Sequence, residues 1–267
     1  MIIIGEKINA TLDAVKTIIL NRDTRSLLDL TQKQAAAGAD YIDVNIGTGV
    51  GSQEDEIRSI KWALESIQGQ VATPLCIDSA DPKVIAAGLE TLNAKPAMIN
   101  SAKAEKHSLE AVVPLAAEHD SLLIALAMDE DGIANTVDGR LRSCEKICTA
   151  CQKYGVPIEN LYIDPLVMPI STDISSGLVT LKTIFAIKKS FPGAKTVTGL
   201  SNVSFGLPQR RRLNIAFLHM CIFAGLDAAI VDPLDEELMA AIKTGEVLAG
   251  KDRYCRRYMR AFRKKSQ

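Results

Sequence analysis

The amino-acid sequence predicts a (β/α)8 TIM barrel built as a single domain. Eight short apolar runs alternate with eight longer amphipathic stretches along the 267 residues, which is the repeat of such a barrel. No glycine-rich phosphate loop follows the first run, and polar residues follow almost every run. A doubly wound open sheet is the alternative, but its polar residues would gather at one switch point.

The apolar runs are short and rich in Ile, Leu and Val, which is typical of buried parallel strands. We expect strands at Ile2–Gly5, Tyr41–Ile46, Leu75–Ile77, Ala97–Ile99, Leu122–Leu126, Leu161–Ile163, Thr196–Leu200 and Ala228–Val231. The helical patterns lie at Leu27–Ala37, Glu54–Ile67, Pro82–Leu92, Leu109–Glu118, Leu141–Tyr154, Leu178–Lys189, Leu213–Ala224 and Glu236–Leu248. Asp81 and Asp235 each precede such a pattern and are predicted to cap a helix.

No linker rich in proline or serine interrupts this alternation, so residues 1–250 are predicted to form the barrel. Residues 251–267 are strongly basic and carry Tyr254, Tyr258 and Phe262 at intervals of four. This spacing predicts an amphipathic terminal helix whose aromatic stripe packs on the barrel or on a second subunit.

The composition argues against several partners and compartments. A formal net charge of −1 provides no general attraction to nucleic acid or to a membrane surface. Met1–Gly5 already reads as a strand rather than a signal peptide, and no apolar run reaches membrane-spanning length. Six irregularly spaced cysteines are typical of reduced thiols, so we expect a cytoplasmic protein.

Three of these cysteines, Cys144, Cys148 and Cys151, recur at helical spacing. A metal or iron–sulfur site would need a fourth ligand and usually a loop. Because cysteine also behaves as a small apolar residue, we interpret the three as part of a buried helix face.

Polar residues stand where each predicted strand ends, and in a (β/α)8 barrel these ends meet on one face. In chain order they are Glu6, Asn9, Asp43, Asn45, Asp78, Ser79, Asn100, Ser101, Met128-Asp129, Asp164, Ser201, Asn202 and Asp232. A single Asp after a strand is more often a helix cap than a ligand. Eight such strand ends in succession are harder to explain as caps, so the pattern predicts a binding site.

The residue types at these positions restrict the chemistry. The three histidines fall within helical patterns, and the sequence suggests no lysine at a strand end that could form a Schiff base. Paired carboxylates can hold Mg²⁺, but the interspersed amides weaken that interpretation, and we predict no bound metal. Carboxylates and amides together suit a neutral heterocycle with alternating donors and acceptors.

Six motifs, in order along nearly the whole chain, carry a family resemblance: IGEKIN, DVNIG, LCIDSA, MINSA, YIDPL and GLSNVSFGLP. Together they resemble the pterin-binding methyltransferases. These include the methyltetrahydrofolate:corrinoid/iron–sulfur protein methyltransferase, the folate domain of cobalamin-dependent methionine synthase and, more distantly, dihydropteroate synthase. The family's fold is a (β/α)8 barrel, as the periodicity independently predicts.

The resemblance implies roles for particular residues. Asn202 in GLSN matches the family's catalytic amide, which hydrogen-bonds N5 of the folate, the nitrogen that carries the methyl group. The expected pterin-binding residues are Asp78, Asn100 and Asp164, with Asp43, Asn45 and Ser201 in supporting positions. Phe205 is expected at an apolar rim, and Arg210 and Arg211 are expected to contact the folate tail or a partner; a solvated first helical turn is the alternative for these arginines.

The activity implied by the resemblance is methyl transfer, in either direction, between N5 of tetrahydrofolate and the cobalt of a corrinoid protein. The chain carries no Asp-x-His-x-x-Gly cobalamin motif; the resemblance therefore implies that a partner protein brings the corrinoid, and it also implies a homodimer. Two alternatives stay open: a dihydropteroate synthase-like enzyme, and a non-catalytic subunit that binds pterin.

Overall fold

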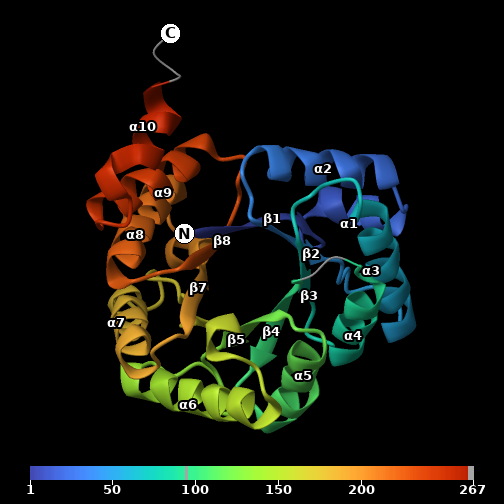
Figure 1. Cartoon of the computed structure of the whole chain (residues 1–267), viewed down its shortest axis with the longest axis horizontal. Helices are drawn as coiled ribbons and strands as arrows, with labels where there is room; N and C mark the ends of the chain where they lie inside the picture. The colour runs from blue at the N-terminus through green and yellow to red at the C-terminus, as the bar shows by residue number, and fades with distance from the viewer. Residues whose placement is uncertain (94–95, 264–267) are drawn as a thin grey trace.

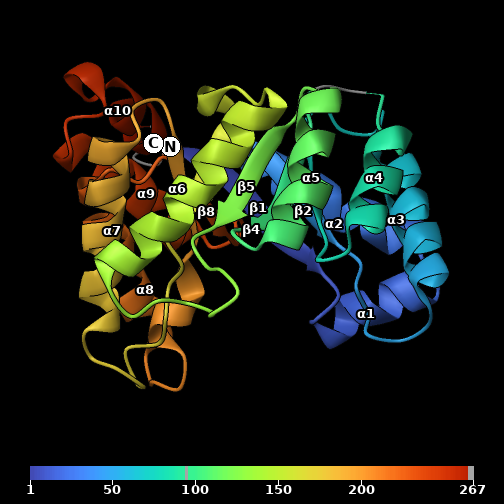
Figure 2. The same cartoon turned by 90° about the horizontal axis from the view of Figure 1, so that it is seen from below.

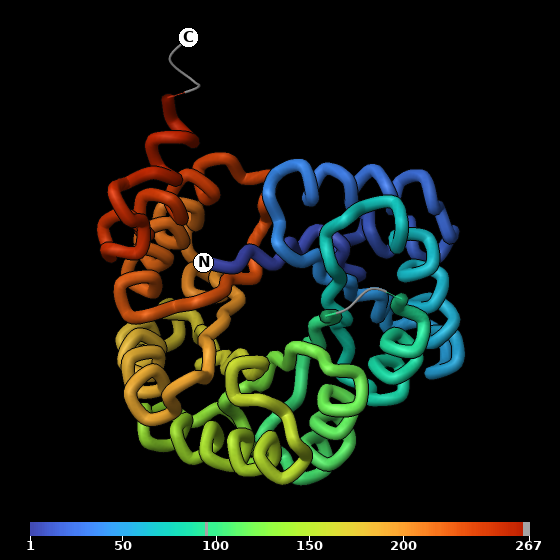
Figure 3. Tube along the Cα trace, in the orientation of Figure 1, coloured from blue at the N-terminus to red at the C-terminus, as the bar shows by residue number. Residues whose placement is uncertain are grey.

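Eight parallel strands close into a barrel in chain order, each hydrogen-bonded to the next and β8 to β1. A computed structural model describes residues 1–93 and 96–263 of the chain. Within them the helices form an outer ring around the strands (Figure 1). The colours in Figure 3 pass once around this ring from the N-terminus to the C-terminus. The predicted (β/α)8 barrel is therefore confirmed, and the open sheet is excluded because the sheet has no edge.

The strands are β1 (Ile2–Asn9), β2 (Tyr41–Asn45), β3 (Leu75–Asp78), β4 (Met98–Lys103), β5 (Leu122–Leu126), β6 (Leu161–Asp164), β7 (Lys195–Gly199) and β8 (Ala228–Val231). The α-helices are α1 (Asp13–Leu20), α2 (Thr24–Ala36), α3 (Gln53–Ile67), α4 (Pro82–Thr91), α5 (Lys106–Glu118), α6 (Val137–Tyr154), α7 (Ser176–Ser190), α8 (Arg210–Ala224), α9 (Glu236–Leu248) and α10 (Arg256–Arg263). Three 3-10 helices complete the described elements: η1 (Ile158–Asn160), η2 (Leu200–Ser204) and η3 (Arg253–Cys255).

The strand boundaries differ most from prediction at β1 and β4, which both continue into polar residues. Their pairing registers shift at these points, between Gly5 and Ile8 and between Asn100 and Ala102. Apolar periodicity ends at the irregularity, but backbone hydrogen bonding to the neighbouring strand resumes beyond it. Apolar runs alone therefore predict these two strands too short.

Helix ends follow local signals more closely than strand ends do. Asp81 accepts from the backbone N–H of Lys83, and Asp235 accepts from that of Leu238, so both predicted caps are confirmed. The short helix α1, with Val15 and Ile19 on its buried side, was not predicted. Eight residues present only this pair at a helical interval, which is too little for a periodic pattern.

The C-terminal helix forms, but the predicted aromatic stripe is interrupted. The Tyr258 and Phe262 rings lie 4.6 Å apart on α10, whereas Tyr254 lies in η3 with φ +57° and is largely exposed. Residues 264–267 of the predicted tail lie outside the described residues. Figure 2 shows α10 at the opposite end of the barrel from α1.

The core has an inner and an outer layer. Inside the barrel, one side chain from each strand packs against the others: Ile4, Tyr41, Cys76, Met98, Ile124, Tyr162, Val197 and Ala228. Outside it, apolar side chains of the strands meet those of the helices. Cys144 and Cys151 are buried in this outer layer and Cys148 packs against it, which confirms the core interpretation of all three. Burial raises the pKa of Cys144 to about 12 and that of Cys148 to about 11.

Candidate functional site

A polar layer lies directly above the apolar plug inside the barrel. Strand side chains alternate between the two faces, so the residue two positions beyond each plug residue also points inward. These residues are Glu6, Asp43, Asp78, Asn100, Leu126, Asp164, Gly199 and Ile230. The strands end here, so the layer forms the floor of the barrel mouth, the end where the carboxyl ends of the strands meet. The mouth lies on the same side as α1 in Figure 2.

Asp43, Asn45, Asp78 and Asn100 form one connected cluster on β2, β3 and β4. The strand register pairs Asn45 with Asp78 and Asp78 with Asn100. The Asn45 amide donates to Asp78 Oδ2 over 2.9 Å, and that of Asn100 donates to Asp43 Oδ1 over 3.4 Å. The sequence prediction that these four lie together is thus confirmed.

The two carboxyl groups of this cluster are harder to ionise than ordinary aspartates. Burial, and then the Asp78 charge, raises the pKa of Asp43 well above its ordinary value. Burial also raises the pKa of Asp78, while hydrogen bonds from Asn45 and Asp43 oppose that rise. Asp43 therefore holds the proton of the pair, and Asp78 is the better acceptor.

Asp164 ends β6 and is 7 % exposed. Its Oδ1 accepts from the backbone N–H of Leu166 over 2.7 Å. Burial raises the pKa of Asp164 to about 6, against the effects of Leu166, Thr198 and the Arg140 charge. The Thr198 hydroxyl is close enough to lower this pKa, yet it makes no full hydrogen bond within the described residues. It retains hydrogen-bonding capacity beside a carboxylate.

Glu6 occupies the β1 position of the polar layer, where the sequence assigned no firm role. Burial, and then the Asp232 charge, raises its pKa to about 7. Lys7 Nζ pairs with Asp232 Oδ2 at 3.0 Å beside it. The expectation that no lysine stands at a strand end was wrong, because β1 runs past Gly5 through its bulge and β4 ends at Lys103. Lys7 is engaged in its ion pair with Asp232, and Lys103 pairs with Glu105 at 3.5 Å.

Asn202 lies in η2, next to the end of β7, and its side chain is exposed. The backbone around it is fixed: Leu200 and Val203 are buried, and the Val203 carbonyl accepts from the Ile170 N–H over 3.1 Å. No described residue hydrogen-bonds the Asn202 amide. Ser201 is also exposed, and its carbonyl accepts from Arg210 over 2.8 Å. A rigid loop thus presents a free amide at the mouth.

The arginines that follow have intramolecular contacts. Arg210 braces η2 through the Ser201 carbonyl and the Ser204 hydroxyl. Arg211 pairs with Asp235, and with Glu237 at 3.2 Å, at the start of α9. These acids explain how cations are tolerated at the N-terminus of α8, where the helix dipole disfavours them. Arg212 is exposed and makes no such contact in the part of the chain that the structure describes.

Several polar strand ends do not join the layer. Asp129 is held by Lys146 of α6 over 2.8 Å, and Asn9 accepts from Thr11 in a local turn. Ser79 donates to Glu56 over 3.1 Å. Local partners thus engage these three side chains, which adjacency to an apolar run does not reveal. Residues 1–93 and 96–263 contain no cluster of His, Cys, Asp or Glu suited to a metal ion.

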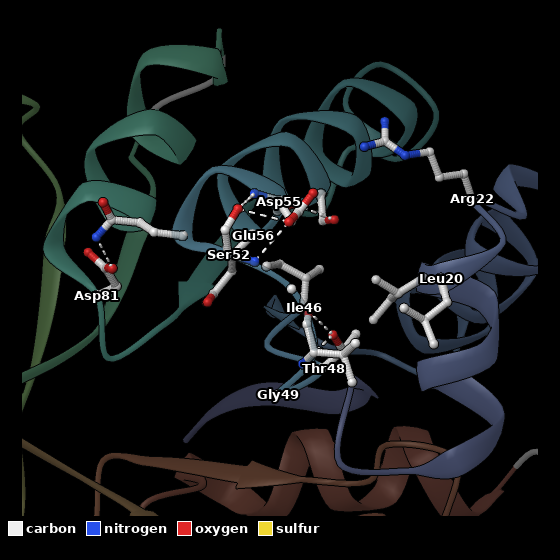
Figure 4. A pocket seen from close by; sticks show the side chains of 14 residues that line it. Leu20, Arg22, Ile46, Thr48, Gly49, Ser52, Asp55, Glu56 and Asp81 are labelled. Atoms are coloured by element: carbon white, nitrogen blue, oxygen red, sulfur yellow. Dashed lines mark hydrogen bonds between the residues drawn. The ribbon is translucent and has the colours of Figure 1, made fainter.

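A cavity of about 540 Å³ lies beside the mouth, between the end of α1 and the loop after β2. Figure 4 shows Leu20 and Arg22 on one wall and Ser52, Asp55 and Glu56 on the other. None of the inward polar residues lines it. We place the site at the polar layer because, among the residues that the structure describes, only that layer combines several convergent acceptors with raised carboxyl pKa values.

Comparison with known proteins gives results consistent with this geometry. The model of the family described as pterin binding enzyme matches residues 5–232. Methylcorrinoid:tetrahydrofolate methyltransferase of Eubacterium limosum is 38% identical over 265 residues, covering 98% of this chain and 96% of the relative. Methionine synthase of Mycobacterium tuberculosis is 32% identical over 86% of this chain, which spans only 20% of that longer protein.

Solved structures share the fold. 7,8-Dihydropteroate synthase from Vibrio fischeri superposes with a TM-score of 0.73 at 19% identity, covering 94% of both chains. A dihydropteroate synthase from Coxiella burnetii, in complex with pteroic acid, gives 0.72 at 17% identity, again over 94% of both chains. At these identities the likeness establishes the barrel and no more. No helix among the described residues is long and apolar enough to span a membrane.

Proposed function

Because the chain belongs to the pterin binding enzyme family, we propose that it is a methyltransferase acting between N5 of tetrahydrofolate and the cobalt of a corrinoid protein. The observation that carries this proposal is the inward polar layer, with the free Asn202 amide at its edge. The near full-length relative with this activity favours it over a dihydropteroate synthase-like reaction.

The polar layer binds the pterin ring. Asp78 and Asp164 each carry an oriented carboxylate, fixed by Asn45 and by the Leu166 N–H respectively. Such acceptors suit the ring and exocyclic N–H groups of an aminopyrimidinone. Asn100 supplies an amide beside them, and Asp43 and Asn45 hold the neighbouring groups in place. Ser201 lies beside Asn202 at the edge of this site.

Asn202 hydrogen-bonds N5. When the folate donates the methyl group, this nitrogen must gain positive charge before the methyl group leaves. In the reverse direction, the nitrogen loses a proton after it has received the methyl group. A neutral amide, or a water that it orients, interacts more strongly as charge develops on N5 and so stabilises the transition state more than the bound substrate. β7, β8 and β1 are consecutive in the barrel, so Asn202 and Glu6 belong to the same side of the mouth. Glu6 is thus placed to exchange this proton through water.

A partner protein brings the corrinoid to the mouth, and its cobalt supplies the methyl-transfer chemistry. Large apolar side chains are exposed in the loops around the mouth, among them Leu12, Val50, Ile174 and Phe205. An exposed apolar rim around a polar floor is typical of a protein interaction site. Phe205, in the loop next to Asn202, is the rim residue best placed to contact an arriving macrocycle.

The anionic tail of the folate leaves the mouth on the Arg212 side. Arg212 is the arginine of the cationic turn left without a partner in residues 1–93 and 96–263. The cavity of Figure 4 is less suitable, because Asp55, Glu56 and Asp81 outnumber Arg22 on its walls. Arg210 shapes the loop beneath, and Arg211 is engaged by Asp235 and Glu237.

We also propose a homodimer and a cytoplasmic location. Phe185, Met220, Phe223 and Leu248 are all about half exposed or more on adjacent helices α7, α8 and α9, which form one side of the barrel in Figure 1. Homodimer interfaces are enriched in such surfaces. All six cysteines are free thiols, as is usual in a reducing compartment. Within the described part of the tail, residues 251–263 are proposed to be an appendage to the barrel.

The activity is tested by mixing the purified protein with methyltetrahydrofolate and free cob(I)alamin and following the corrin absorption spectrum. We expect conversion to the methylated corrin.

Asn202→Ala should slow conversion at least tenfold while changing methyltetrahydrofolate affinity little, because the hydrogen bond of the Asn202 amide strengthens in the transition state. Asp164→Ala should instead weaken binding. Binding without turnover by the unaltered protein would support a non-catalytic pterin carrier, and equal losses in the Asn202 variant would contradict its role.

A further inference from the structure

Arg140 of α6 is buried, with 1 % of its surface exposed, although arginine is rarely buried without a carboxylate partner. Its Nε donates to the Ala134 carbonyl over 2.9 Å. One terminal nitrogen, Nη1, donates to the carbonyls of Pro165 and Leu166, each over 2.7 Å, and lies 3.3 Å from the Thr180 hydroxyl. No carboxylate among the described residues lies within ion-pair distance.

These contacts all hold the segment that follows β6. Leu166 has φ +67°, a left-handed backbone conformation that is uncommon for a leucine. Its carbonyl is fixed by Arg140 and Thr180, and its N–H donates to Asp164. A continuous chain of hydrogen bonds therefore runs from the guanidinium through Leu166 to the Asp164 carboxylate.

The Arg140 charge also acts on Asp164 directly. It opposes the effect of burial on the pKa of this carboxyl, and the two charges attract each other. Neutral groups also act on Asp164: the Thr198 hydroxyl of β7, the backbone N–H groups of Leu166 and Gly199, and the Cys221 thiol of α8. In a buried site such an attraction is weakly screened.

We propose that Arg140 is a positioning residue, which holds Asp164 both in place and in the ionised form that accepts pterin N–H groups. The proposal rests on the proposed function, in which Asp164 binds the pterin. An arginine is needed because its planar group donates in several fixed directions at once. A lysine would keep the charge but could not span Ala134 and the Pro165–Leu166 carbonyls together.

The test measures the dissociation constant of tetrahydrofolate between pH 6 and pH 9 for Arg140→Met, Arg140→Lys and the unaltered protein. Arg142→Met, on the exposed face of the same helix, is the matched control. Without the cation the pKa of Asp164 rises above about 6. Each unit by which this pKa exceeds the pH of the solution lowers the ionised fraction of Asp164 about tenfold. We expect Arg140→Met to bind about tenfold more weakly at pH 7, with the difference shrinking severalfold by pH 9. Arg140→Lys should weaken binding but keep the pH midpoint.

Unchanged affinity, or a loss in Arg140→Met that is the same at every pH, would overturn the proposal, because a purely structural role predicts no shift of midpoint. If Arg140→Met does not fold by circular dichroism, Arg140→Gln takes its place, because it removes the charge but keeps hydrogen-bond donors: weaker binding with a raised pH midpoint supports the proposal, and an unshifted midpoint refutes it. Asp164→Asn separates a failure of the proposed pterin site from a failure of the proposed role of Arg140. If that variant binds tetrahydrofolate normally, the proposed site fails; if only Asp164→Asn binds poorly, the role of Arg140 fails alone.

Discussion

At the scale of single residues, the carboxyl groups of the polar layer lower the stability of the fold, and the site requires them nonetheless. Glu6, Asp43, Asp78 and Asp164 are all buried enough for their pKa values to be raised. A buried carboxyl that prefers its neutral form destabilises the folded protein whenever the pH forces it to ionise. Bound N–H donors would relieve this cost, so ligand binding and ionisation are coupled in these residues.

Glu6 gives the clearest pH dependence. Its folded-state pKa of about 7 exceeds the ordinary value of 4.5, so the folded state holds the proton more tightly than the unfolded chain. The resulting stability is present below pH 4.5 and is lost as the pH rises through 7. Glu6→Gln stays neutral and should raise the free energy of unfolding at pH 8 by on the order of 2–3 kcal/mol. The gain should shrink toward pH 5.

Denaturant unfolding at several pH values measures this difference. Glu65→Gln, on the exposed face of α3, is the control and should leave the curve unchanged. A Glu6→Gln variant with the same stability as the unaltered protein at pH 8 would show that ionisation of Glu6 does not lower the free energy of unfolding. The same variant should lose methyl-transfer activity, since it can no longer exchange a proton.

At the scale of elements, the bulge of β1 depends on the neighbouring helix α2. The buried side chain of Gln34 accepts from the Lys7 N–H over 2.9 Å at the irregularity. Gly5 makes room for it, because a Cβ there would lie 2.6 Å from Gln34 Oε1. This contact lets β1 bulge where Glu6 and Lys7 enter the mouth.

Replacing Gln34 by Leu should therefore destabilise the protein and disturb the mouth. The Lys7 N–H would lose its acceptor, which costs about 1–3 kcal/mol for a buried donor. The Gln34 amide nitrogen itself has no partner in the described residues, so its removal offsets part of that loss. Gln32→Leu, on the exposed side of α2, is the control. Urea unfolding checks the difference; equal stability of the two variants would mean that the bulge does not need Gln34.

At the scale of the whole molecule, exposed apolar side chains gather in two separate places. One group surrounds the mouth, in the loops that carry Leu12, Val50, Ile174 and Phe205. The other lies on α7, α8 and α9, where the Phe185 and Phe223 rings meet edge to face 6.0 Å apart. The separation allows two copies to associate through their sides while both mouths stay accessible to a corrinoid protein.

The side surface should be the dimer interface. Phe223 is 72 % exposed, and Phe223→Glu would place a charge in the middle of an apolar contact, so we expect the dimer to dissociate to monomers at micromolar concentration. Leu20→Glu, on α1 across the barrel and 55 % exposed, is the control. Light scattering coupled to gel filtration measures the mass. A dimer that persists in the Phe223 variant would place the interface elsewhere.

From the sequence alone, the number and order of the strands and the closed barrel could be predicted, because short apolar runs alternate regularly with helical patterns. Which polar strand ends turn inward, and how far β1 and β4 extend, could not. Motif order likewise identified Asp78, Asn100, Asp164 and Asn202 as the residues to examine. Tertiary structure alone decided which atoms meet. Arg140 reaches the carbonyls after β6, Lys7 pairs with Asp232, and Arg211 turns to α9 instead of the mouth. Such pairs join residues far apart in the chain, and only barrel closure and helix packing bring them within hydrogen-bond distance.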